Sequence, residues 1–237
     1  MTGIYLYNDL YFAKSDEDTV HFIDVSRCNL GHVALGHYFS RRNSGSSNLR
    51  FSENVIRGNV NGADVQFCLF EKNIISTQIS YFNGNCTFRN NIFTHYASYQ
   101  NVFSHSSGLI VNNNIFTRDN HGLEGSQINN NIFSINIDGQ PGGTNIGDGN
   151  IGSQSASSVF VDFDGIAFNY SADLHLMNGS PGINGGTDGN HIGIYGTDKP
   201  YKPSAVPHNP HIRSVEIPDE SEDGFLPVQI SVGTQEN

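Results

Sequence analysis

Residues 86–94 read Cys-Thr-Phe-Arg-Asn-Asn-Ile-Phe-Thr, and this nine-residue pattern decides the fold. Close variants of it recur on both sides. They are LRFSENVIR at 49–57, CLFEKNIIS at 68–76, LIVNNNIFT at 109–117 and SQINNNIFS at 126–134. The sixth letter of every copy is an asparagine, and the five are Asn54, Asn73, Asn91, Asn114 and Asn131, spaced by 19, 18, 23 and 17 residues.

Each copy alternates between apolar and polar residues before its asparagine. The inner positions, three and five residues before it, are Phe51, Phe70, Phe88, Val111 and Ile128, and Leu49, Cys68, Cys86, Leu109 and Ser126. A period of two with one apolar face predicts a short strand that is buried on one side. Asparagine tolerates the left-handed backbone region, so we expect the chain to bend at the repeated asparagine. An apolar pair follows it and begins the next side.

A unit of 17 to 23 residues cannot bury its apolar face alone, but stacked units can. The pattern therefore predicts an all-β protein, a parallel β-helix of about seven coils from residue 15 to residue 170. Equivalent asparagines would form a ladder of amide hydrogen bonds along it. Helical repeats lack support because no apolar pattern of period 3.6 spans the copies, leucine-rich repeats would need more leucine, and a left-handed hexapeptide helix would need a strict period of six.

Composition limits the possible functions. The 237 residues include 29 asparagines and no tryptophan, and the net charge of −11 argues against nucleic acid as a partner. No apolar run exceeds four residues, so neither a membrane-spanning helix nor a signal peptide is expected within this sequence. The three cysteines form no disulfide framework, and Cys68 and Cys86 should stack as free thiols in the core.

Residues 172–196 carry a second motif, ADLHLMNGSPGINGGTDGNHIGIYG. It resembles the closing segment of right-handed parallel β-helix proteins of the pectate-lyase-like superfamily that Bacteroidetes-type bacteria secrete. Matching positions are Ser180, Pro181, Ile183, Gly185, Ile192, Gly193, Tyr195 and Gly196, whereas Gly182 replaces an alanine and His191 stands where aspartate is common. With the coils, the resemblance covers residues 50–196. It implies a secreted or surface location, but the architecture hosts many activities.

The chain divides into three parts by composition. Residues 1–196 would form the β-helix, whose abrupt start at Met1 suggests an incomplete or uncapped N-terminal end. Residues 197–210 hold four of the eight prolines and predict a semi-rigid linker. Residues 211–237 alternate like two short strands and predict a small β appendage or tail.

Polysaccharide is the partner that we expect, because elongated sugar chains match the long face of a solenoid. A lyase needs a base and a cation beside a uronate carboxyl group. The candidate catalytic residues are His95, Arg118, Asp119 and His121, with His105 and Thr77 as candidate substrate-binding residues. His95 and Arg118 both stand four residues after their asparagines, so they should lie on adjacent coils. A solvated polar loop edge is the alternative interpretation of this cluster.

Other chemistries receive less support. A hydrolase needs converging carboxylates, and no two of the five acids between residues 49 and 134 share an offset from their asparagine. Glu71 is explained by pairing with Arg89 on the next coil. No cofactor is expected, and calcium has no specific motif, since the aspartate-rich turns at 162–165 and 188–190 lack the ligand series of a calcium loop. The sequence thus predicts a monomeric, secreted or surface module that binds polysaccharide. If the protein also cleaves its ligand, lyase chemistry is favoured over hydrolysis. A non-catalytic structural or adhesion solenoid is the alternative.

Overall fold

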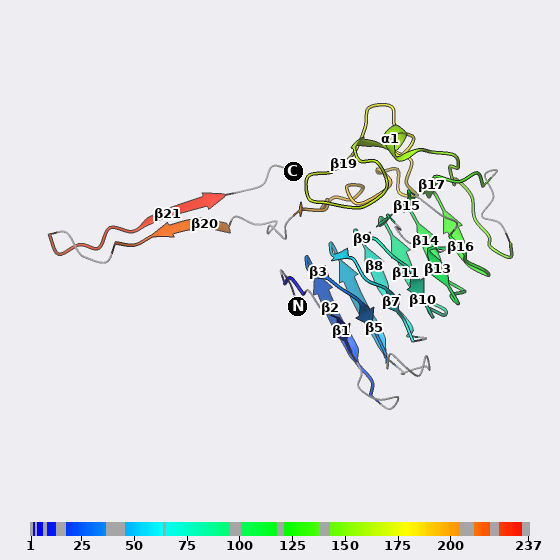
Figure 1. Cartoon of the computed structure of the whole chain (residues 1–237), viewed down its shortest axis with the longest axis horizontal. Helices are drawn as coiled ribbons and strands as arrows, with labels where there is room; N and C mark the ends of the chain where they lie inside the picture. The colour runs from blue at the N-terminus through cyan, green and yellow to red at the C-terminus, as the bar shows by residue number, and fades with distance from the viewer. Residues whose placement is uncertain are drawn as a thin grey trace.

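The computed structural model describes residues 2, 4–6, 9–12, 18–36, 46–63, 65–94, 101–117, 121–137, 143–203, 211–218 and 223–233. Almost all of its regular structure is β-strand, and one short helix, α1 (Ala156–Val159), occurs in this part of the chain. Figure 1 shows the strands stacked side by side in chain order, with the last hairpin standing apart.

Three parallel sheets form the sides of a β-helix. Sheet A contains β2 (His21–Ser26), β5 (Ser47–Ser52), β8 (Leu69–Glu71), β11 (Thr87–Arg89), β14 (Ile110–Asn112) and β16 (Gln127–Asn129). Sheet B contains β3 (Asn29–Leu30), β6 (Val55–Ile56), β9 (Ile74–Ile75), β12 (Ile92–Phe93), β15 (Ile115–Phe116) and β17 (Ile132–Phe133). Sheet C contains β1 (Leu10–Tyr11), β4 (Val33–Ala34), β7 (Val60–Asn61), β10 (Ile79–Ser80) and β13 (Phe103–Ser104).

About four turns of the solenoid are complete, with one strand in each sheet, so the prediction of seven coils is wrong. The next two turns, which start with β14 and β16, have described strands only in sheets A and B. Beyond β17, residues 146 and 151 pair with the preceding turn only through isolated bridges. The glycine-rich composition at this end explains the loss, because glycine supplies no side chain to the core and costs more backbone entropy.

Phenylalanines fill the interior in stacks. Phe51, Phe70 and Phe88 lie above one another on sheet A, with ring centroids 4.7 and 4.9 Å apart. Phe116 on sheet B stacks on its neighbours Phe93 and Phe133 at 4.6 Å. These distances match the spacing of parallel strands, so the predicted stacking of equivalent residues is confirmed. The three cysteines are free and buried, also as predicted.

The repeated asparagines lie fully buried between sheets A and B. Asn73 is typical: its Nδ2 donates to Asn91 Oδ1 at 3.0 Å and to the carbonyl oxygen of Phe51 at 2.9 Å. Its Oδ1 accepts from the backbone nitrogen and Nδ2 of Asn54, at 2.9 and 3.0 Å. Side-chain bonds of the same kind join Asn91 to Asn114, Asn114 to Asn131 and Asn131 to Asn150. We call these six residues, from Asn54 to Asn150, the asparagine column.

The bend itself lies one residue earlier than expected. The left-handed backbone conformation belongs to the residue before each of the first five column asparagines, with φ between 51° and 59°. These bend residues are Glu53, Lys72, Asn90, Asn113 and Asn130. The column asparagines therefore do not bend the chain, and their buried amides instead satisfy the backbone groups that the bend exposes.

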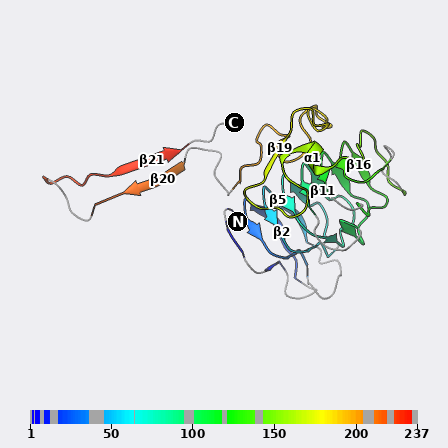
Figure 2. The same cartoon turned by 45° about the horizontal axis from the view of Figure 1, so that its top comes forward.

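The outer face of sheet B is covered by residues 151–203, which we call the closing segment. Its apolar side chains, among them Phe160, Leu174 and Ile192, pack on outward-facing residues of sheet B such as Ile74 and Ile115 and form a second core outside the solenoid. Within this segment β18 (Phe160–Asp162) pairs antiparallel with β19 (Asp173–Leu176). Figures 1 and 2 show α1 and β19 lying against one side of the stacked strands.

The C-terminal strands form a separate antiparallel hairpin of β20 (His211–Glu216) and β21 (Gln229–Gly233). Figure 2 shows it extending away from the solenoid. Many of its apolar side chains are exposed, including Ile212 at 60% and Val232 at 59%.

Candidate functional site

Three of the four predicted catalytic residues, His95, Arg118 and Asp119, lie outside the described residues. The fourth, His121, is buried with 6% of its surface exposed. Its Nδ1 accepts the backbone N–H of Leu123 at 3.0 Å, and its ring meets that of Phe133 edge-on at 5.6 Å. The structure thus gives His121 a packing role.

The two predicted substrate-binding residues lie on the surface. The His105 ring stacks on Tyr81 with centroids 4.9 Å apart, and its Nδ1 is 2.8 Å from Ser104 Oγ. Thr77 donates a hydrogen bond to Asn59 Oδ1. Because His105 faces solvent and His121 faces the core, the two histidines do not present their rings to one ligand.

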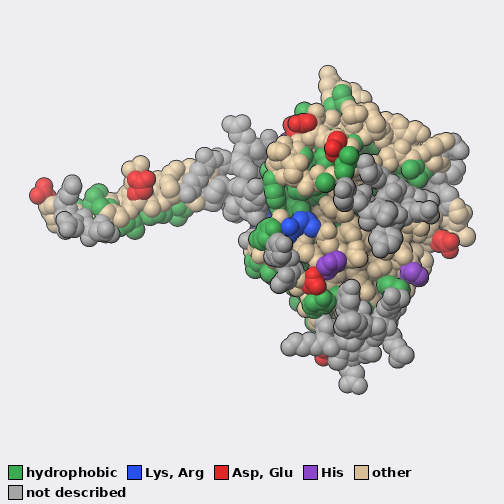
Figure 3. Space-filling model, in the orientation of Figure 1, with side chains coloured by type: hydrophobic (Ala, Val, Ile, Leu, Met, Phe, Trp, Pro, Cys, Tyr) green, Lys and Arg blue, Asp and Glu red, His purple; other side chains and the backbone are tan. Residues whose placement is uncertain are grey.

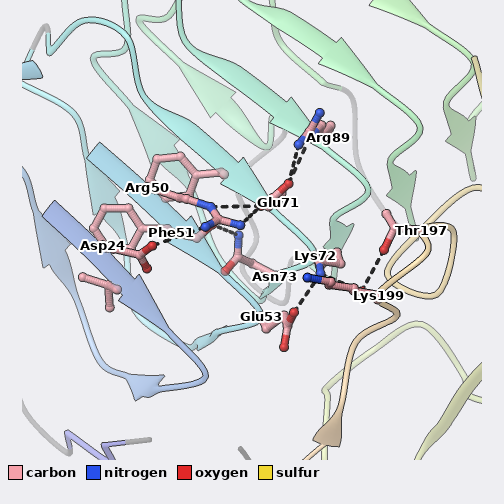
Figure 4. Close-up of polar contacts among 12 residues, drawn as sticks. Asp24, Arg50, Phe51, Glu53, Glu71, Lys72, Asn73, Arg89, Thr197 and Lys199 are labelled. Atoms are coloured by element: carbon pink, nitrogen blue, oxygen red, sulfur yellow. Dashed lines mark hydrogen bonds and ion pairs between the residues drawn. The ribbon is translucent and has the colours of Figure 1, made fainter. Parts of the chain in front are cut away.

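A charged row crosses the outer face of sheet A (Figure 4). The carboxylate of Glu71 is held from both sides: Arg50 donates to Oε1 at 2.5 and 3.0 Å, and Arg89 donates to Oε2 at 2.7 and 3.0 Å. Arg50 also reaches Asp24 at 3.3 Å. The predicted pair of Glu71 and Arg89 is therefore confirmed, although the Glu71 side chain is only 7% exposed beneath the arginines.

This arrangement keeps Glu71 ionised. Burial alone would raise its pKa, but the hydrogen bonds from Arg50 and Arg89 outweigh burial and hold the pKa of Glu71 below its ordinary value. The pKa of Arg50 is raised, chiefly by its hydrogen bond to Glu71. Since both carboxylate oxygens are occupied by guanidinium groups, Glu71 is a structural anion and offers no free lone pair to act as a base.

The bend residues bind the closing segment along one edge of sheet A. Lys72 Nζ lies 2.7 Å from Glu53 Oε1 and donates to the carbonyl oxygen of Lys199, also at 2.7 Å (Figure 4). Asn90 Nδ2 donates to the carbonyl oxygen of Gly193 at 3.1 Å. The equivalent bond from Asn130 goes to Gly185. The side chains that follow sheet A therefore position the loops of the closing segment beside that sheet.

Between this edge of sheet A and the closing segment lies a cavity of about 410 Å³, which we call the amide cavity. Its lining consists of Thr87, Arg89, Asn90, Asn112, Asn113, Thr187, Asp188, Asn190, Thr197 and Asp198. Asn113 joins the two walls, because its Oδ1 accepts from Thr187 N at 2.9 Å and its Nδ2 donates to Thr187 Oγ1 at 3.2 Å. On the loop side, Asp188 accepts two hydrogen bonds from Asn190.

The lining is rich in amides and hydroxyls, and its two carboxylates are Asp188 and Asp198. No histidine, tyrosine, lysine or cysteine is among the described residues that line the amide cavity. Its one cation, Arg89, is committed to Glu71. Figure 3 shows that charged side chains are sparse on the face of the solenoid turned to the viewer. The amide cavity is therefore equipped to exchange hydrogen bonds with a polar ligand.

The described ranges contain neither a cluster of metal-ligating side chains nor a membrane-spanning helix. There, no group of three or more histidine, cysteine, aspartate and glutamate side chains is placed to hold a metal ion. Among the same residues, no helix has the length and apolar character needed to cross a membrane.

The fold defines the class: the chain is a parallel β-helix protein. Comparison with family models, curated proteins and solved structures finds no match to it. The function must therefore be argued from the amide cavity and its surroundings.

Proposed function

We propose that the protein binds polysaccharide, with the amide cavity as the site that holds one or two sugar units. The observation that carries this proposal is the lining of the cavity: asparagine, threonine and aspartate side chains converge from sheet A and from the loop at 187–198. Each sugar hydroxyl donates and accepts hydrogen bonds, as amide and hydroxyl groups do. The volume of about 410 Å³ lies in the usual range for ligand sites.

The charges favour a neutral glycan. Asp188 and Asp198 place two carboxylates in the cavity, whereas Arg89 is already paired with Glu71. A uronate would therefore meet repulsion from these two carboxylates, and the net charge of −11 adds to this repulsion. We propose binding as the activity of this cavity: its lining holds no imidazole or phenol, and its carboxylates are Asp188, which accepts two hydrogen bonds from Asn190, and Asp198.

The resemblance of residues 172–196 adds a context. We propose, on those motif residues, that the coil is right-handed and that the protein belongs among the secreted, pectate-lyase-like solenoids of bacteria. We also propose that the protein acts as a monomer, since residues of one chain form both walls of the amide cavity.

A binding panel tests the proposal. Neutral xylan, mannan and β-glucan, together with pectate and alginate, would be titrated by calorimetry, and ultraviolet absorbance would report any unsaturated lyase product. We expect a neutral glycan to bind without product. The variants Asn112→Ala and Asn190→Ala should each weaken binding by about 3- to 10-fold, the effect of one lost hydrogen bond.

Asn83→Ala serves as the matched control, because Asn83 is an exposed amide outside the cavity. Equal loss in this control, or no binding across the panel, would contradict the proposal and favour a structural or adhesion role. Lyase product from the wild type would contradict binding without cleavage.

A further inference from the structure

A second cavity, of about 190 Å³, lies within the closing segment and has a different character. Four aromatic rings line it, Phe168, Tyr170, Tyr195 and Tyr201, together with Asp173 and His175. We call it the aromatic cavity. It shares no lining residue with the amide cavity, so binding at one cavity can be tested separately from binding at the other.

The rings are set at steep angles to one another. Phe168 and Tyr170 meet at 72° with centroids 5.3 Å apart, and Tyr195 and Tyr201 meet at 81° with centroids 6.2 Å apart. His175 stacks on Tyr195 at 3.9 Å, which fixes the Tyr195 ring. Rings held in two perpendicular pairs enclose a small volume from several sides, as a cage does.

Tyr201 forms a buried wall of this cavity. Its residue surface is 5% exposed, and burial is the main cause that raises the pKa of its hydroxyl group. Tyr201 therefore presents an uncharged ring to the cavity.

The local charge is negative. The carboxylate of Asp173 contacts His175 Nδ1 at 2.6 Å, and the backbone hydrogen bond from His175 is the main cause that lowers the pKa of Asp173. Burial and the charge of Asp173 raise the pKa of Tyr195 to about 12. No lysine or arginine is present among the described residues that line the cavity. A positive ligand would therefore meet a carboxylate and the negative faces of the rings.

We propose that the aromatic cavity binds an alkylated ammonium group, such as the trimethylammonium head of choline. The electron-rich ring faces attract an organic cation, and Asp173 neutralises its charge. The cavity holds the volume of about six water molecules, which suits a compact head group and is below the usual range for larger ligands. The carboxylate of Asp173 beside the rings favours a cation over an uncharged ligand of the same size.

The test compares choline with 3,3-dimethylbutanol, which has the same shape and no charge. Both would be titrated into the full chain while proton NMR follows their methyl signals. Methyl groups that sit against ring faces shift upfield, and the wall variants below show whether the rings responsible are those of the aromatic cavity. We expect choline to bind at least about tenfold more tightly than its neutral analogue.

Two variants probe the walls, and one probes specificity. Tyr170→Ala removes an exposed ring and Asp173→Asn removes the charge while keeping the shape, so each should weaken choline binding by about 3- to 10-fold. Tyr81→Ala, which removes a surface tyrosine on the solenoid, should leave it unchanged. Equal affinity for choline and the neutral analogue would overturn the proposal, and so would an absent upfield shift or an unchanged affinity in both wall variants.

Discussion

At the scale of the residue, the asparagine column shows how one side chain stabilises two neighbouring turns. Asn91 has no exposed surface, and both of its polar atoms are fully bonded. Its Oδ1 accepts from the backbone nitrogen and Nδ2 of Asn73, and its Nδ2 donates to Asn114 Oδ1 and to the carbonyl oxygen of Phe70. Removal of the Asn91 side-chain amide would leave buried donors and acceptors unpaired on both neighbouring coils.

We therefore expect Asn91→Ala to lower the free energy of unfolding by about 3 kcal/mol, the cost of two or so unsatisfied buried groups. Urea denaturation followed by circular dichroism measures it. Asn83→Ala, at an exposed asparagine, should change stability by less than about 0.5 kcal/mol. Similar values for the two variants would mean that the column bonds contribute little.

The Glu71 carboxylate predicts a pH dependence. Its folded pKa lies below the ordinary value, because the arginine hydrogen bonds outweigh burial. The stability it contributes is therefore complete above the unfolded pKa, near 4.5, and is lost as the pH falls through the lower folded pKa. Glu71→Gln should destabilise the protein at pH 7 by about 1 to 3 kcal/mol.

The difference between wild type and Glu71→Gln should shrink as the pH falls below about 4.5 and through the lower folded pKa, because the wild-type carboxylate then becomes protonated as well. Denaturation over a descending series of pH values measures this convergence. A difference that stays constant with pH would show that the loss comes from packing rather than from the charge.

The sequence separates residue roles only in part. Its period identified every column asparagine that the repeat contains, together with the buried positions three and five residues earlier. It could not distinguish the two asparagines of the doublets at 90–91, 113–114 and 130–131. One bends the chain and the next bonds along the column, and both tasks suit asparagine.

At the scale of the element, sheet B has apolar residues on both faces. In the doublets Ile92-Phe93, Ile115-Phe116 and Ile132-Phe133, the phenylalanine faces the interior and the isoleucine faces out, yet all six are buried. In a strand whose outer face meets solvent, apolar and polar residues would alternate along the sequence. The doublets therefore carried a signal that something covers this sheet, and the closing segment is that cover.

The amide cavity could not be predicted in the same way. Its walls come from Asn113 and Thr187, which lie 74 positions apart and follow no common repeat. The cluster at His95 and Arg118 is predicted because both residues stand at the same position within their repeats. That reasoning cannot be applied to the closing segment, which packs on the coils from outside and is not part of the repeat. Equal spacing predicts neighbours only for residues that belong to the repeat.

Packing of the closing segment is testable at Ile192, which is fully buried against the outer core of sheet B. Ile192→Ala should destabilise the protein by about 2 to 4 kcal/mol, since it removes buried methyl groups and leaves a cavity. Limited proteolysis should then cut within residues 151–203 more readily. Ile183→Ala, at a residue that is 37% exposed, is the control and should have a much smaller effect. Equal effects in the two variants would contradict the role of the outer core.

At the scale of the whole molecule, the hairpin of β20 and β21 stands apart from the solenoid in both ribbon views (Figures 1 and 2). Its exposed apolar side chains include Val215, Ile230 and Val232, and a two-stranded hairpin is at best marginally stable by itself. The solenoid and its closing segment already bury two apolar cores without it.

We therefore expect a chain ending at Pro203 to keep the melting temperature of the full chain within about 2 °C, an effect below 1 kcal/mol. Removing the exposed apolar strands should also raise solubility, because exposed strand edges and apolar patches promote association. Calorimetry and light scattering of the two chains measure both effects, with Asn91→Ala in each background as the reference for a true loss of core stability. A large fall in melting temperature on truncation would show that the hairpin packs against the solenoid and belongs to its fold.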